Sequence, residues 1–237
     1  MSEQRKLWAV VPVGPFAQAK RRLMPCLAPH ERAACARAML ADVLSALGRS
    51  ASLAGILVVT SDAEAAVMAE AAGALVLADS ENAGVSAAAQ MAASYLARAG
   101  RGGMLLIPAD VPLVTPEDID AIVSAHRPAP AVTLVAASAD GGTNALACSP
   151  PDAIAFRFGA DSFRLHQQAA RERSIEAQVL QLARVGRDID RPEDIAAFLA
   201  CPSATRSYAC LSGYAVAQGL LHAAATKPEP SVDRVTQ

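Results

Sequence analysis

Short apolar runs alternate with longer, Ala-rich stretches over most of the chain, and this alternation constrains the fold more than any other feature. The apolar runs predict buried strands at residues 7–13, 55–60, 74–77, 104–107, 132–137, 144–148 and 179–185. The stretches between them predict helices at residues 29–47, 63–72, 85–100, 116–126, 162–173 and 192–199. Strands that alternate with helices form βαβ units, so we expect an α/β fold in which helices cover both faces of a mostly parallel sheet.

The pattern changes after His126, where two strand-like segments flank a turn. Asp140-Gly141-Gly142 between them is a hairpin-type turn signal, so we expect an antiparallel insertion within the sheet. The length of 237 residues suits one α/β domain with a short appendage. We place this domain at residues 1–203, an extra apolar helix at 204–226 and a disordered tail at 227–237.

Composition excludes several classes of protein. Hydrophobic residues make up 53% of the chain and charged residues 19%, which excludes a disordered protein. A formal net charge of −2 argues against a general nucleic-acid binder, although it leaves room for a small anionic ligand. The five cysteines lack CxxC spacing and indicate neither a disulfide framework nor a zinc site.

The expected location follows from two further absences. No apolar stretch reaches the roughly 20 residues that a membrane span needs, and the polar residues 1–6 do not form a signal peptide. We therefore expect a cytoplasmic protein with no membrane partner and no nucleic-acid partner. The apolar helix at 204–226 leaves two possibilities open: it covers the domain's own surface, or it serves as an interface such as that of a homodimer.

Three aspartates follow predicted strands at the edge where open α/β sheets bind their ligands. Asp110 follows the fourth predicted strand, and Asp188 and Asp190 follow the last one. Carboxylate oxygens are ligands that Mg²⁺ prefers, and an Asp-x-Asp pair on an extended segment points both side chains to one side. Taken singly, Asp190 could instead cap the next helix and Asp110 could stabilise a turn. Three acids at matching strand ends favour the metal site.

Basic and small polar residues at the same edge could bind anions. Lys20 and Arg22 lie in the loop after the first strand and suit a polyphosphate, with a solvated surface patch as the alternative. Thr143 follows the glycines of the predicted turn and could contact a phosphate or carboxylate. Gly159 and Ser162 open a helix, whose N-terminus attracts anions. The structural alternatives there are a plain turn and a plain helix cap.

These segments, in this order, resemble the guanylyltransferase family of coenzyme F-420 biosynthesis, which belongs to the wider MobA-like group with a glycosyltransferase-A type nucleotide-binding fold. The resemblance covers roughly residues 7–200. The motifs that carry it are Val11-Pro12-Val13, Ala19-Lys20-Arg21-Arg22-Leu23, Thr60-Ser61-Asp62, Pro108-Ala109-Asp110-Val111-Pro112-Leu113, Gly141-Gly142-Thr143-Asn144-Ala145-Leu146, Phe156-Arg157-Phe158-Gly159 with Ser162-Phe163 and His166, and Asp188-Ile189-Asp190.

The resemblance implies an Mg²⁺-dependent nucleotidyltransferase. Such an enzyme transfers GMP from GTP to 2-phospho-L-lactate, phosphoenolpyruvate or 3-phospho-D-glycerate and releases pyrophosphate. Two alternatives stay open. The chain could be a MobA-like transferase that uses another nucleotide or acceptor, or a degenerate homologue that binds a nucleotide without turnover.

The resemblance also implies a role for each candidate residue. The residues that would contact the nucleotide are Pro12, Val13, Lys20, Arg22, Gly84 and Ser86. The residues that would hold Mg²⁺ are Asp110, Asp188 and Asp190. The residues that would hold the phospho-acid are Thr143, Gly159 and Ser162. Lys20 and Asp110 would be the catalytic residues, whereas we assign His166 a packing or surface role.

Two positions depart from the family pattern. The family usually has Lys where this chain has Gly14, which implies the loss of one phosphate contact. It usually has Gly-Leu-Asn where this chain has Gly84-Val85-Ser86, which implies altered contacts to the base or ribose.

Overall fold

The computed structural model describes residues 6–139 and 141–214, which form a sheet of seven strands in the order β3-β2-β1-β4-β6-β5-β7. The strands are β1 (Leu7–Val13), β2 (Gly55–Thr60), β3 (Leu75–Ala78), β4 (Gly103–Leu106), β5 (Ala131–Ala136), β6 (Thr143–Ser149) and β7 (Gln178–Leu180). β6 runs antiparallel to β4 and β5, and the other described pairs are parallel. This confirms the mostly parallel α/β sheet with an antiparallel insertion.

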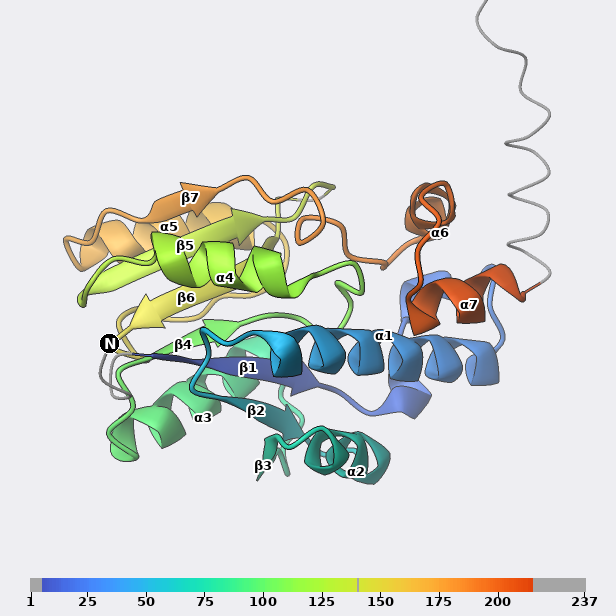
Figure 1. Ribbon diagram of the computed structural model, residues 1–237, viewed down its shortest axis with the longest axis horizontal. Coiled ribbons are helices and arrows are strands. Elements are labelled where there is room, and N and C mark those ends of the chain that lie inside the picture. Colours follow the sequence, from blue (N-terminus) through green and yellow to red (C-terminus); the bar gives the residue numbers. More distant parts are fainter. Residues whose placement is uncertain (1–5, 140, 215–237) are drawn as a thin grey trace, which may run out of the picture.

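Helices cover both faces of the sheet, as the alternation predicts (Figure 1). They are α1 (Pro29–Arg49), α2 (Ala63–Ala71), α3 (Val85–Arg98), α4 (Pro116–Ala125), α5 (Ser162–Glu172), α6 (Pro192–Leu199) and α7 (Arg206–Ser212). α1, α2 and α4 pack on one face, and α3 and α5 pack on the other. Among these described helices, none combines the length and the apolar character that a bilayer crossing requires.

The central strand β1 illustrates why unbroken apolar runs form strands here. Ala9 and Val11 point into the core beneath α1, whereas Val10 points into the core beneath α3, and all three are fully buried. A parallel strand that is covered on both faces leaves no position for a polar side chain. On α3, Ala89 and Ala93 recur one helical turn apart and present small side chains to the sheet.

Two helix starts follow the capping chemistry that their sequences predict. The Asp62 carboxylate accepts hydrogen bonds from the backbone N–H groups of Glu64 and Ala65 at the start of α2. At the start of α4, Thr115 and Asp118 cap each other's backbone N–H groups. A side-chain cap of this kind stabilises a helix by about 1 kcal/mol.

The last strand is shorter than predicted. A strand was expected over residues 179–185, but β7 ends at Leu180, and the chain then turns. Gly186 donates its N–H to the carbonyl of Leu182 at 2.9 Å, and its own carbonyl accepts from the N–H of Ser138 at 2.7 Å. Val185 is fully buried within this turn. The predicted strand extended too far because Val185 is apolar and buried although it does not belong to a strand.

α7 lies within the segment where the extra C-terminal helix was expected, but this helix ends at Ser212. Residues 215–226 of the expected helix and the expected tail at 227–237 lie outside the described residues. Leu211 on α7 is fully buried against α1 and α6, in a cluster with Met39 and Phe198. The described part of this segment thus covers the domain's own surface.

The hairpin between β5 and β6 forms as predicted, although Asp140 lies outside the described residues. The N–H of Ala137 donates to the carbonyl of Gly142 at 2.9 Å and closes the connection. The register between the two strands shifts at Val135 and Ala136, so the ladder is irregular next to the turn.

Candidate active site

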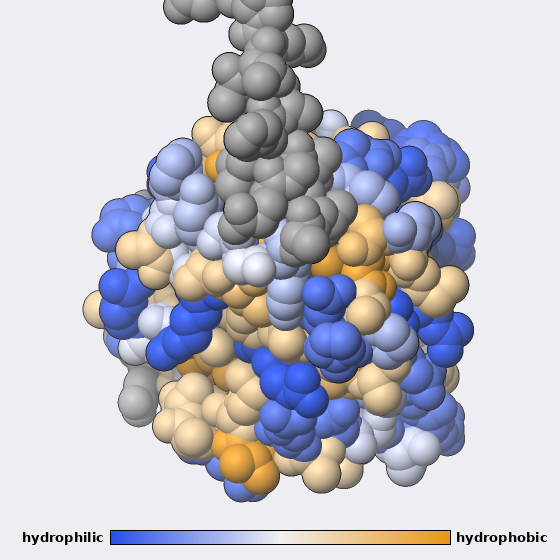
Figure 2. Space-filling model, turned by 90° about the vertical axis from the view of Figure 1, so that its right-hand side faces the viewer, coloured by the Kyte–Doolittle hydropathy of each residue, from blue (hydrophilic) through white to orange (hydrophobic). Residues whose placement is uncertain are grey.

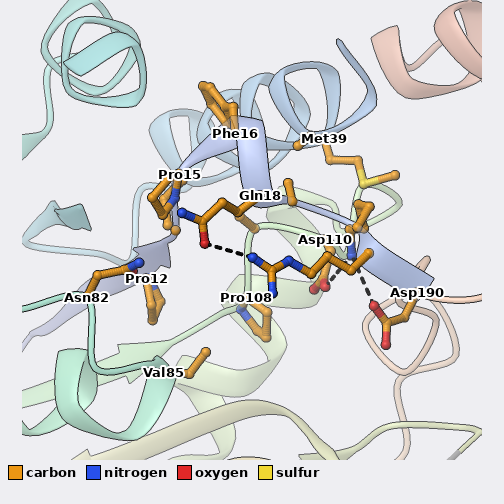
Figure 3. Close-up of a pocket in the computed structure, with 17 residues that line it drawn as sticks. Pro12, Pro15, Phe16, Gln18, Met39, Asn82, Val85, Pro108, Asp110 and Asp190 are labelled. Carbon is orange, nitrogen blue, oxygen red and sulfur yellow. Dashed lines mark hydrogen bonds and ion pairs between the residues drawn. The ribbon is translucent and has the colours of Figure 1, made fainter. Parts of the chain in front are cut away.

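A pocket of about 380 Å³ opens at the carboxyl ends of β1 and β4, the edge where α/β folds bind ligands. The loop after β1 (residues 14–27, called the β1 loop below) forms one wall. Figure 3 shows Pro12, Asn82 and Val85 at one end of the pocket and Asp110 and Asp190 at the other. Figure 2 looks onto this end of the molecule, where hydrophilic residues cross the face between hydrophobic areas.

Side chains from other elements hold the β1 loop in place. The buried Phe16 donates its backbone N–H to the Asp62 carboxylate at 2.9 Å. Arg32 on α1 is almost fully buried and donates to the backbone carbonyls of Ala19 and Leu27. These polar contacts fix the loop backbone from two sides, so its basic side chains start from a defined position.

Lys20 is the central cation of the site. Its backbone adopts the left-handed conformation, with φ of 53°, which is uncommon for a residue other than glycine. Its side chain is only 9% exposed, and its Nζ lies 2.6 Å from Asp110 Oδ2 and 3.9 Å from Asp190 Oδ1. Strained backbone at a charged, inward-pointing residue is typical of functional sites.

The Asp190 carboxylate does not cap the following helix, which was its structural alternative. Asp194 caps the start of α6 by accepting from the backbone N–H groups of Asp190 and Arg191, at 3.0 and 2.7 Å. The Asp190 carboxylate points instead toward Lys20, as does that of Asp110 (Figure 3). Both acids are thus available to the pocket.

Asp188 lies beside this pair. Its Oδ1 accepts a hydrogen bond from Asn144 Nδ2 at 3.0 Å. Burial raises the pKa of Asp188 above the usual aspartate value, and the nearby charge of Asp110 raises it further. The backbone joins the two segments as well, because the N–H of Ile189 donates to the Asp110 carbonyl at 3.1 Å. The structure therefore brings Asp110 close to the segment that carries Asp188 and Asp190, although the sequence places these two segments far apart.

The donor chemistry of these aspartates suits a divalent cation, because hard carboxylate oxygens are what Mg²⁺ binds. Within residues 6–139 and 141–214, however, no group of three His, Cys, Asp or Glu side chains is arranged to hold a metal ion. Lys20 pairs with Asp110 and lies 3.9 Å from Asp190, which also pairs with Arg22. The Mg²⁺ site remains a prediction that requires Lys20 to move toward a ligand.

Of the other residues that the resemblance assigns to the nucleotide, some line the pocket and others do not. Pro12 and Val13 line the pocket. Arg22 pairs with Asp190 and is 61% exposed, outside the lining. At Gly14 the structure has open space, because an added Cβ would meet only Asn82 Oδ1, at 3.9 Å.

Gly84 and Ser86 flank the lining residue Val85 at the start of α3, and neither lines the pocket. Gly84 has φ of 93°, which favours glycine. Ser86 Oγ accepts the backbone N–H of Phe158 at 2.8 Å. The hydroxyl expected to face the base or ribose is therefore bonded to the loop that precedes α5 (residues 155–161, called the α5 loop below).

Two of the three predicted phospho-acid residues, Thr143 and Ser162, form a hydrogen-bonded cluster with His166 on α5, and Gly159 lies in the loop before that helix. Thr143 Oγ1 lies 3.0 Å from His166 Nδ1 and accepts from Ser162 Oγ at 3.3 Å. Thr143 and Ser162 are 4% and 1% exposed, whereas Gly159 is exposed and has φ of 124°. Asn144 links this cluster to the aspartates, because it follows Thr143 and bonds Asp188.

Several residues to which sequence analysis assigned no binding or catalytic role lie in the pocket lining or behind it. These are Gln18 and Asn82 in the lining, and Arg32, Asp62, Asn144 and His166 behind it. Arg21, from the basic run after the first strand, also lines the pocket. Asn144 and His166 lie within motifs that were quoted, so their position in those motifs was the available signal. Nothing in the residue pattern marks Arg32, because its role is to bond backbone carbonyls of the β1 loop, which directly precedes α1.

The fold is of the nucleotide-diphospho-sugar transferase type, a class of α/β fold. A crystal structure from Desulfovibrio desulfuricans G20, provisionally named as such a transferase, matches with a TM-score of 0.72 at 17% identity. The match covers 94% of this chain and 98% of that one. At this identity the likeness shows the fold alone.

The sequence comparisons identify the family. Residues 7–225 match the family described as "Guanylyl transferase CofC like", and the chain belongs to it. The phosphoenolpyruvate guanylyltransferase of Rubrobacter xylanophilus is 38% identical over 80% of this chain and 92% of its own length. The 3-phospho-D-glycerate guanylyltransferase of Colwellia psychrerythraea is 36% identical, over 78% and 88% respectively. The 2-phospho-L-lactate guanylyltransferase of Methanothermobacter thermautotrophicus is 32% identical, over 80% and 82%.

Proposed function

We propose that this chain transfers GMP from GTP to a small phosphorylated acid and releases pyrophosphate, the reaction type of coenzyme F-420 biosynthesis. The acceptor would be phosphoenolpyruvate, 2-phospho-L-lactate or 3-phospho-D-glycerate, the acids in the names of its relatives. The observation that carries the proposal is the placement of Lys20 between Asp110 and Asp190 in the pocket at the carboxyl ends of β1 and β4.

The chemistry needs positioning more than acid–base catalysis. A phosphate oxygen of the acid attacks the α-phosphorus of GTP, and a diphosphate linkage forms between GMP and the acid. The bond from the α-phosphorus to the bridging oxygen breaks, and pyrophosphate leaves with that electron pair. Because the attacking oxygen is already anionic, catalysis depends on alignment and on neutralising charge.

The pocket has a charge balance that favours a bound divalent cation. Its described lining carries the cations Lys20 and Arg21 and the anions Asp110 and Asp190. A triphosphate brought against this lining adds negative charge with no excess of protein cations to balance it. Mg²⁺ held by Asp110, Asp188 and Asp190 would supply that balance and a template for the phosphates.

The chain's own residues then have separate tasks. Lys20 would turn from Asp110 to the phosphates and stabilise the charge that develops on the leaving pyrophosphate. Pro12, Val13 and Val85 form the apolar end of the pocket, which suits a base. The phospho-acid would lie against the exposed Gly159, with Thr143 and Ser162 supporting the site from beneath.

A substrate panel tests the proposal. Each of GTP, ATP, CTP and UTP is combined with each of the three acids and Mg²⁺, pyrophosphate release is measured, and products are identified by mass spectrometry. We expect release with GTP and at least one acid, with a guanylylated acid as the product. Turnover only with a nucleotide other than GTP would support the wider MobA-like alternative. Nucleotide binding in calorimetry with no turnover for any pair would support the non-catalytic one.

A further inference from the structure

We propose that Ser86 and His166 are positioning residues that clamp the backbone of the α5 loop and thereby set the affinity for the phospho-acid. This inference rests on the proposed function, because it takes Gly159 as part of the acceptor site. It gives Ser86 a different task from the nucleotide contact that the family resemblance implies.

The first half of the clamp is His166. Its Nε2 accepts the backbone N–H of Arg157 at 3.0 Å, and since an amide N–H can only donate, Nε2 carries no proton. His166 is fully buried, and burial lowers its pKa to about 4, so the ring is neutral at neutral pH. The single ring proton is therefore on Nδ1, which donates to Thr143 Oγ1 at 3.0 Å.

The second half of the clamp is Ser86. Its Oγ accepts the backbone N–H of Phe158 at 2.8 Å, so two consecutive amides of the α5 loop are each held by a side chain. The Phe158 ring also packs edge-on against His166, with the ring centroids 4.8 Å apart. Two amides fixed in succession leave the backbone between them little freedom.

The clamp joins two sides of the active site. Ser86 is on the first turn of α3, next to the pocket residue Val85, whereas His166 is on α5 beside Thr143. The next residue after the two held amides is Gly159, which is exposed and has φ of 124°. The acceptor site thus depends on the start of the helix that flanks the nucleotide pocket.

Matched pairs of variants test each half. Ser86→Ala removes the acceptor for Phe158, whereas Ser86→Thr keeps a hydroxyl. His166→Asn can still donate to Thr143 but is too short to reach Arg157, whereas His166→Gln can place its amide oxygen near the Nε2 position. KM for phosphoenolpyruvate and for GTP, and kcat, are measured for each, with thermal melting as the folding control.

We expect Ser86→Ala and His166→Asn to raise KM for phosphoenolpyruvate by roughly three- to tenfold, the effect of losing one hydrogen bond. KM for GTP should change much less, and the Thr and Gln variants should retain more of the acid affinity than their partners. Faster amide hydrogen exchange of the α5 loop in the Ala and Asn variants should accompany the loss, and this readout needs no turnover.

Two results would overturn the clamp. A rise in KM for GTP but not for the acid in Ser86→Ala would mean that Ser86 contacts the nucleotide. Equal losses in His166→Gln and His166→Asn, with unchanged hydrogen exchange in the α5 loop, would leave His166 only a packing role. Failure of the wild-type protein to turn over any acid would instead contradict the proposed function, and the exchange experiment would still test the clamp.

Discussion

The ammonium of Lys20 lies 2.6 Å from the carboxylate of Asp110, although 90 positions separate the two residues. They meet because β1 and β4 are parallel neighbours, so the segments that leave their carboxyl ends run side by side. Asp190 belongs to a third segment, and its Oδ1 lies 3.9 Å from Lys20 Nζ. The site therefore depends on strand order, and a bound triphosphate would have to compete with the acids for Lys20.

Replacing Lys20 tests this competition. Lys20→Met keeps the length of the side chain and removes the charge, so the developing negative charge on pyrophosphate loses its partner. We expect kcat/KM for GTP to fall by about 10²–10³-fold, the usual effect of losing one transition-state donor. Lys20→Arg is the matched control and should retain part of the activity. A loss of less than tenfold in Lys20→Met would contradict a catalytic role.

Asp188 gives a prediction about pH and stability. Its pKa is raised in the folded protein, chiefly by burial and further by Asp110, so folding favours the protonated carboxyl. Without Mg²⁺, ionised Asp188 should destabilise the fold above its raised pKa, and this effect should vanish as the pH falls below the ordinary aspartate value. Asp188→Asn should therefore melt at a higher temperature than the wild-type protein at pH 8, but not in strong acid.

The same variant should be nearly inactive, with a loss of about 100-fold or more if the carboxylate holds the catalytic cation. Glu70→Gln, on the exposed side of α2, is the control for removing one negative charge. If Asp188→Asn were less stable than the wild-type protein at pH 8 without divalent cations, the ionised Asp188 carboxylate would not be destabilising the fold.

Sequence reasoning predicted the layers of this fold because each β-strand and helix has a strong local signal. The unbroken run in β1 and the caps at Asp62 and Thr115 are examples. It failed at residues 179–185, where Val185 is buried in a turn, because an apolar side chain signals burial and not strand geometry.

The candidate site was predictable to a lesser extent. Asp110 closely follows the end of β4, as predicted, whereas Asp190 lies well beyond the end of β7 at Leu180, where a strand end was expected to place it. The structure nevertheless brings both beside Lys20. The support from His166 and Ser86 was not predictable, since it consists of bonds to backbone amides of the α5 loop, which is close to His166 in the sequence but far from Ser86. Such contacts depend on where the loop lies and leave no pattern in the residue types.

Gly14 offers a gain-of-function test. The family resemblance implies a lysine at this position, and the structure leaves open space there in the pocket wall. Gly14→Lys should add a charge-assisted contact to the triphosphate and lower KM for GTP by roughly tenfold. Gly14→Gln, which adds similar bulk without charge, should not. Equal KM values for the two variants would mean that position 14 does not face the triphosphate.

The C-terminal helix should contribute to stability. Leu211 is fully buried between α7, α1 and α6, so Leu211→Ala should lower the free energy of unfolding by about 3 kcal/mol. The matched control is Leu75→Ala on the edge strand β3, where the side chain is 46% exposed and the cost should be smaller. Urea denaturation of both variants measures the difference. Similar costs would mean that α7 adds little to the folded domain.

The fate of the α-phosphorus of GTP shows whether GMP is transferred to the acid. The protein is incubated with Mg²⁺, phosphoenolpyruvate and GTP labelled at either the α- or the γ-phosphorus, and the labelled species are separated. We expect the α-label to move into a guanylylated acid and an equal amount of γ-label to appear in pyrophosphate. An α-label that stays in GTP, or that appears only in free GMP or GDP, would contradict it.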